Sequence, residues 1–146
     1  MDYNEKIEKI VEYIRSGEKD ESDFMVGFEA EHFIVDGDTS ETLKYDEDGG
    51  VRENLEDIEK LGYKGLYEND NIMGISADEF SISIEPGAQF EVAFDRQKTV
   101  GELFDNYKKV MEELIPIFDK KNELLVELGY QPKTKIEDIP FIPKER

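Results

Sequence analysis

Carboxylates occur in two separated runs of this sequence that otherwise have the composition of β-strands. Glutamate is a poor strand former, and like charges that face each other destabilise a sheet. Such side chains are tolerated when a cation lies among them, and magnesium and manganese prefer hard oxygen ligands. The four carboxylates belong to Glu29, Glu31, Glu85 and Glu91. Their placement predicts a site for a divalent cation.

The second run, residues 80–94, is typical of a β-hairpin. Two short β-type segments flank a Pro-Gly turn. Because side chains alternate between the faces of a strand, we expect Glu85, Gln89 and Glu91 on one face and the large apolar residues on the other. Gln89 could hydrogen-bond a substrate from this face; the alternative is an ordinary solvated strand residue.

The first run, residues 26–35, places Glu29 and Glu31 two residues apart and hence on one face. His32 alternates to the opposite face, where we expect a core histidine with satisfied hydrogen bonds. A buried carboxylate without a partner is costly. Lysine or arginine would be the ordinary partner, but both runs are nearly free of basic residues, which favours a metal ion.

Several glutamates around two or more divalent ions suit phosphoryl transfer from a nucleotide, because the ions bridge and neutralise phosphate oxygens. The sequence has no glycine-rich P-loop, Rossmann fingerprint or nucleophile elbow. We therefore expect a nucleotide to bind through metal ions held by the sheet rather than at a helix N-terminus.

Composition limits the classes of function. The 146 residues predict one domain, 1–146, and the 38% of hydrophobic residues are enough for a modest core. A formal net charge of −19 argues against binding a nucleic-acid backbone or an anionic membrane through bulk charge. There is no cysteine, no signal-like N-terminus and no long apolar run. We expect a soluble, cytoplasmic protein.

Hydrophobic periodicity and turn residues predict the elements that position the carboxylates. Helices are expected over 3–16, 52–61 and 99–128, and strands over 23–35, 66–68 and 72–75 besides the hairpin, with a possible short strand at 42–45. No helix of ordinary length fits between residues 65 and 94, so these strands should be antiparallel. The fold class is α+β, with carboxylates on one face of the sheet and helices on the other.

The long helix and the residues that follow it have different sequence patterns. The long helix should begin at a capping box of Thr99 and Glu102, kink at Pro116 and end at Gly129. Residues 130–146 contain three prolines and no periodicity. We interpret them as an extended tail that leads to an absent C-terminal part.

The sequence resembles the N-terminal part of glutamate–cysteine ligase, in its plant-type and bacterial branch. The likeness rests on residues 27–33, Gly-Phe-Glu-Ala-Glu-His-Phe, and residues 83–91, Ser-Ile-Glu-Pro-Gly-Ala-Gln-Phe-Glu. The second motif is the more specific, with Ala88 where glycine is more usual. Residues 128–130 and 140–146 also resemble the family, so that the likeness spans most of the chain.

The resemblance implies a partial glutamine-synthetase-like catalytic fold whose sheet is the floor of the active site. It implies ATP-dependent activation of glutamate as an acyl phosphate, attack by the cysteine amine, and formation of γ-glutamylcysteine for glutathione. Carried over to this sequence, Glu29, Glu31, Glu85 and Glu91 would hold Mg²⁺ or Mn²⁺ against ATP, and Gln89 would lie near the substrate. No catalytic residue beyond these metal ligands is implied.

The main difference between this sequence and the family is its length, because family members are several times longer. The resemblance therefore implies an N-terminal fragment with little activity alone, whose apolar surface would dock the missing C-terminal part or a second copy in a homodimer. Two alternatives stay open. One is a related carboxylate–amine ligase with another amine acceptor, and the other is a non-catalytic acidic module that binds a basic partner.

Overall fold

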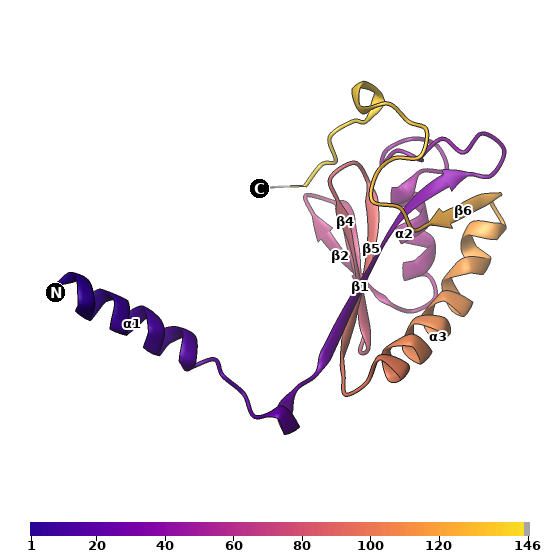
Figure 1. Cartoon of the computed structure of the whole chain (residues 1–146). Coiled ribbons are helices and arrows are strands. Elements are labelled where there is room, and N and C mark those ends of the chain that lie inside the picture. The colour runs from indigo at the N-terminus through magenta and orange to yellow at the C-terminus, as the bar shows by residue number, and fades with distance from the viewer. Residues whose placement is uncertain (145–146) are drawn as a thin grey trace.

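The computed structural model describes residues 1–144 and confirms the α+β class (Figure 1). Over these residues three α-helices and six strands form. The helices are α1 (Tyr3–Arg15), α2 (Val51–Glu59) and α3 (Val100–Asp119). The strands are β1 (Val26–Asp36), β2 (Lys64–Glu68), β3 (Asn71–Ser76), β4 (Phe80–Glu85), β5 (Gln89–Gln97) and β6 (Glu123–Val126). Short 3₁₀ turns lie at Glu21–Asp23 and Ile136–Asp138.

The strands form one sheet in the order β2-β3-β4-β5-β1-β6, and each pair of neighbours is antiparallel, as predicted. Strand β1 has 11 residues and two partners. Its first part pairs with β5, up to His32 opposite Phe90, and its last part pairs with β6, from Phe33 opposite Val126. The two predicted carboxylate segments are therefore neighbouring strands in the centre of the sheet.

One face of the sheet is covered by α2 and α3 (Figure 1). Alternate residues of β4 and β5 are fully buried against these helices: Ile82, Ile84, Phe90 and Val92. The Phe90 ring packs edge-on against Phe118 of α3, with 5.9 Å between ring centroids. Burial of this apolar face is the main source of stability, at about 25 cal/mol per Å² of apolar surface, and it leaves the other face of the strands for function.

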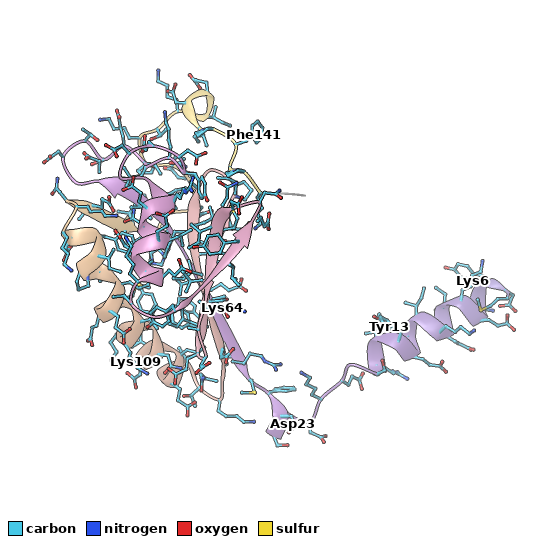
Figure 2. All side chains as sticks on the ribbon, turned by 180° about the vertical axis from the view of Figure 1, so that it is seen from behind. Lys6, Tyr13, Asp23, Lys64, Lys109 and Phe141 are labelled. Atoms are coloured by element: carbon cyan, nitrogen blue, oxygen red, sulfur yellow. The ribbon has the colours of Figure 1, made fainter. Side chains whose placement is uncertain are left out.

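Helix α1 forms where its periodicity predicts it, and Asp2 and Glu5 make a capping box at its start. None of its residues is buried, and it lies away from the sheet (Figures 1 and 2). Its apolar stripe of Ile7, Ile10 and Ile14 is consequently exposed. The expectation of helices on one face of the sheet holds for α2 and α3 but not for α1.

The prediction of one helix over 99–128 is wrong in its last third. The capping box of Thr99 and Glu102 forms, and α3 continues through Pro116, but it ends at Asp119. The chain then reverses at Asn122, whose φ of 57° is left-handed. Residues 123–126 pair with the end of β1, which places Leu125 opposite Ile34. Pairing with β1 outweighs the helical spacing of these residues, a tertiary effect that local periodicity does not report.

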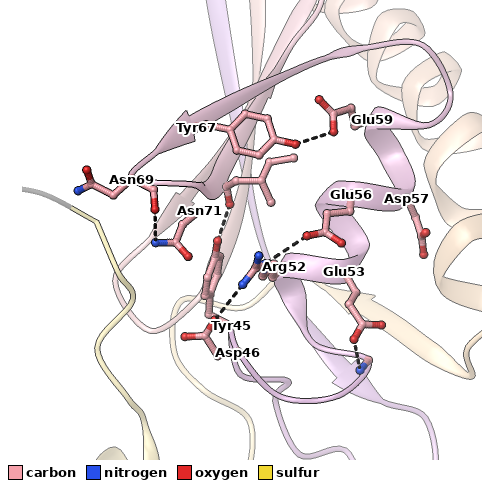
Figure 3. A network of polar contacts seen from close by, with 12 residues as sticks. Tyr45, Asp46, Arg52, Glu53, Glu56, Asp57, Glu59, Tyr67, Asn69 and Asn71 are labelled. Carbon is pink, nitrogen blue, oxygen red and sulfur yellow. Dashed lines mark hydrogen bonds and ion pairs between the residues drawn. The ribbon is translucent and has the colours of Figure 1, made fainter.

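The segment between β1 and α2 is held by polar contacts (Figure 3). The predicted strand at 42–45 is reduced to a single bridge from Thr42 to Val35. Tyr45 is buried and donates its hydroxyl to the Ile72 carbonyl at 2.8 Å. On α2, Arg52 contacts Glu56 at 3.1 Å and Asp46 at 4.0 Å. These contacts connect the segment before α2 to α2 itself and to the start of β3.

Residues 130–144 contain one short 3₁₀ turn, at Ile136–Asp138, and are tied to the body of the molecule by hydrogen bonds. Gln131 donates to the Gly87 carbonyl at 3.2 Å, and the backbone amide of Thr42 donates to the Thr134 hydroxyl at 2.9 Å. The prediction for 130–146 includes residues 145 and 146, which lie outside the described residues. Over residues 1–144, no helix combines the length and apolarity needed to cross a membrane.

Candidate functional site

The register of the central strands brings the predicted carboxylates to one face. Glu31 of β1 lies directly opposite Glu91 of β5, and Glu91 lies opposite Ser83 of β4. Glu85 pairs with Gln89 at the end of the hairpin. Directly opposite residues share a face, and so do residues two apart along a strand. Glu29, Glu31, Glu85, Gln89 and Glu91 therefore stand together on the face that α2 and α3 leave uncovered.

Two hydrogen bonds order this group. The Gln89 amide nitrogen donates to Glu31 Oε2 at 3.0 Å, and the Ser83 hydroxyl donates to Glu91 Oε1 at 3.1 Å. Gln89 thus connects the hairpin to β1, while its own strand partner is Glu85. The amide lies within the carboxylate group, where it could also contact a bound molecule.

Small side chains surround the carboxylates on this face. One row across the sheet contains Glu29, Ala93, Ser81 and Ser76, and the next contains Glu31, Glu91, Ser83 and Gly74. Glu29 and Glu31 are exposed, and Glu85, Gln89 and Glu91 are half-buried. The carboxylates therefore stand among short side chains on this face of the sheet.

The carboxylates act on one another electrostatically. Burial, and then the charges of Glu29, Glu85 and Glu31, raise the pKa of Glu91, against the opposing hydrogen bond from Ser83. A positive charge lies at the edge of the group, because Lys144 Nζ is 3.7 Å from Glu85 Oε1 and donates to the Ile84 carbonyl at 3.3 Å. Excess negative charge is what a cation would relieve.

The same side chains do not form a closed metal cage. Across residues 1–144, no three histidine, aspartate or glutamate side chains lie together in a metal-ligating arrangement. The donors on this face are carboxylate, amide and hydroxyl oxygens, which suit Mg²⁺ or Mn²⁺. Magnesium commonly takes one or two protein carboxylates and completes its shell with water and substrate phosphates. The donor set fits an ion of this kind that binds together with a phosphate ligand.

For the other residues near the site, some of the sequence-based placements were right and others were not. His32 is buried on the opposite face as predicted, but its Nε2 atom has no hydrogen-bond partner, so it is not fully satisfied. Strand alternation puts Ser83 on the same face as Glu85, but its hydrogen bond to Glu91 was not predicted. Lys144 was missed, because its approach to Glu85 depends on how the tail folds back and no local pattern signals that.

Glu91 should make stability depend on pH. Its folded pKa lies above the ordinary value of 4.5, so the folded chain binds this proton more tightly than the unfolded chain. The stabilising effect of protonation is complete below 4.5 and is lost as pH rises through the folded pKa. We expect Glu91→Gln to stabilise the metal-free protein at pH 7.5 by about 0.2–1 kcal/mol, because a like-charge pair across strands is relieved.

Thermal unfolding in EDTA at pH 7.5 and pH 4 would measure this effect. The stabilisation by Glu91→Gln should shrink at pH 4, where wild-type Glu91 is largely protonated. A variant that is less stable than wild type at pH 7.5 would show that the carboxylates do not repel one another in the folded protein.

The part of the chain that contains the carboxylates matches a known protein family. The profile of glutamate–cysteine ligase family 2 matches residues 25–146, which include β1, the hairpin and every residue of the carboxylate face. The chain therefore belongs to this family. The match begins directly before β1, so α1 lies outside it.

Curated relatives cover almost the whole chain. Glutamate–cysteine ligase A, chloroplastic, from Oryza sativa subsp. japonica is 29% identical over 140 residues, which are 95% of this chain and 28% of the relative. The chloroplastic glutamate–cysteine ligases of Arabidopsis thaliana and Nicotiana tabacum are each 30% identical over 95% of this chain and 26% of their own length. The chain thus corresponds to a fragment, about a quarter, of these enzymes.

Proposed function

We propose that this chain forms the metal- and ATP-facing sheet of an ATP-dependent glutamate–cysteine ligase. The observation that carries the proposal is the convergence of four carboxylates from β1, β4 and β5 on one uncovered face. Membership of the family supports the reaction class. The whole enzyme would join glutamate to cysteine as γ-glutamylcysteine, the first step towards glutathione.

Each residue of the face has a proposed task. Glu29, Glu31, Glu85 and Glu91 would hold Mg²⁺ or Mn²⁺ with the ATP phosphates, and the ions would offset the charge that develops during phosphoryl transfer. Gln89, already 3.0 Å from Glu31, would orient the substrate beside them. The residues of this chain thus bind and position, and none of them is proposed as a nucleophile or as a general base.

The proposed site is tested by magnesium binding. With 10 mM Mg²⁺ and a dissociation constant near 1 mM, the folded state gains about 1.4 kcal/mol, which would raise the midpoint of thermal unfolding by roughly 3–6 °C. We expect simultaneous glutamine substitution of Glu29, Glu31, Glu85 and Glu91 to abolish this shift and the heat of binding in calorimetry.

A matched control separates the site from bulk charge. Glu8, Glu12, Glu18 and Glu112 are exposed carboxylates away from the sheet face, and their replacement by glutamine removes the same charge. This variant should keep the full magnesium response. Equal loss in both variants would instead point to a polyanionic surface that attracts cations or basic partners without a defined site.

We propose that the chain alone has little ligase activity, because it spans 28% of the rice relative. The groups that would bind phosphate and substrate carboxylates would come from the remaining length. Phosphate release that depends on ATP and cysteine measures this directly, and turnover at the rate of a full-length enzyme would contradict it. Product analysis with several amines, in a full-length assembly, would identify the acceptor.

A further inference from the structure

A groove lies between α3 and β6, on the side of the sheet opposite the glutamates. Its volume is about 390 Å³, within the range of small-molecule sites. Figure 1 shows β6 returning alongside α3. Apolar side chains from both elements line the groove: Met111, Ile115, Phe118 and Leu125. The proposed ligase site does not use any of these residues.

An unpartnered buried nitrogen lines this groove. His32 is 1% exposed, and its Nδ1 lies 3.4 Å from the Phe90 carbonyl oxygen. Its Nε2 has no hydrogen-bond partner and lies 3.4 Å from Glu127 Oε1. If Nδ1 donates to Phe90, Nε2 is an acceptor that faces a second acceptor. A donor group that bridges the two atoms from the groove would satisfy both.

Glu127 is itself held in place. The Tyr107 hydroxyl donates to Glu127 Oε1 at 2.5 Å. Burial, and then the Glu127 carboxylate, raise the pKa of Tyr107 to about 12, so the phenol stays a donor at neutral pH. Tyr107 therefore orients the carboxylate towards the groove and leaves its second oxygen free to accept.

The charge of the side chains that line the groove indicates which class of ligand would bind there. Asp119, Glu123 and Glu127 contribute carboxylates, and no lysine or arginine belongs to the lining as the described residues define it. Glu123 Oε2 is a second buried polar atom without a hydrogen-bond partner. This lining would repel an anion.

We propose that the groove binds a small organic amine with an apolar body. Its ammonium group would approach from the groove and donate to the Glu127 carboxylate and to His32 Nε2, as charge-assisted hydrogen bonds favour. Its hydrocarbon part would contact Met111, Ile115 and Phe118. This site is separate from the carboxylate face on the other side of the sheet, and it does not depend on the proposed ligase function.

The test uses the intact chain and three probes of similar shape. 2-Phenylethylamine should bind at least tenfold more tightly than uncharged 2-phenylethanol or anionic 3-phenylpropionate in NMR titrations. His32 is the only histidine of the chain, so its ring signals are assigned without ambiguity and should shift with the amine. Equal affinity for the amine and the alcohol would overturn the proposal, and so would unchanged histidine signals.

A pair of variants separates the groove from general charge. Glu127→Gln should weaken 2-phenylethylamine at least tenfold, and its half-exposed position makes misfolding a small risk. Glu113 also accepts a tyrosine hydroxyl at 2.5 Å, from Tyr63, but it lies outside the groove. Glu113→Gln therefore removes the same charge and should leave the affinity unchanged. Equal weakening by both variants would refute a defined site.

Discussion

Phe90→Ala is expected to lower the free energy of unfolding by about 3–5 kcal/mol, the usual cost of truncating a buried phenylalanine. The side chain is fully buried near the start of β5. It packs edge-on against Phe118 and has the His32 ring 6.5 Å away on β1. Its loss would leave a cavity where the sheet meets α3, which rigid strands on both sides cannot close. Urea unfolding followed by circular dichroism would measure the change.

Phe104→Ala supplies the matched control. Phe104 lies on α3, where it is 57% exposed and its ring contacts the Lys108 ammonium at 4.9 Å. Its truncation should cost less than about 1 kcal/mol. A loss below 1 kcal/mol for Phe90→Ala would mean that the core between sheet and helix is not closely packed.

Gly50→Ala should destabilise the protein by about 1–3 kcal/mol through overpacking. A Cβ atom at this position would lie 2.4 Å from the Lys44 carbonyl oxygen and 2.7 Å from that of Glu47. Both are backbone atoms, so the loop would have to move. Gly50 also caps α2, and its carbonyl accepts from the Asn54 backbone amide at 3.2 Å. A shift here would displace the buried side chains of α2.

Gly129→Ala is the appropriate comparison for this substitution. A Cβ atom there would meet no atom within 4 Å, and its φ is not left-handed. The change should be neutral or stabilise by less than about 1 kcal/mol, because alanine restricts the unfolded chain. Similar unfolding midpoints for both variants would show that the turn before α2 tolerates a side chain.

Much of the sheet could be predicted from the sequence, because its signals are local. Alternation along the hairpin placed Glu85, Gln89 and Glu91 on one face, and the Pro-Gly turn fixed their register. Residue spacing alone also put Glu29 and Glu31 on one face of β1. That β1 lies beside β5, which makes the two pairs one group, had no local signal; it was inferred from the scarcity of basic partners for the glutamates and from the family resemblance.

The sequence-based predictions were wrong where contacts between distant parts of the chain determine the structure. Residues 123–126 have helical spacing but form β6, because the end of β1 offers them an unpaired edge. Helix α1 is amphipathic, yet the described residues do not bury its apolar stripe. In the tail, Lys144 reaches Glu85 across 59 positions of sequence. Propensity and periodicity describe neighbours along the chain, and these contacts depend on neighbours in space.

The double pairing of β1 affects how this protein is made. The strand leaves the ribosome before its two partners, which are synthesised only after about 60 and 90 further residues. The segments β2 to β5 form a meander of short connections, which can assemble locally and quickly. Closing the longer loops is slower. During synthesis β1 therefore waits with both edges open, and its insertion, which completes the carboxylate face, is expected to be the last step of folding.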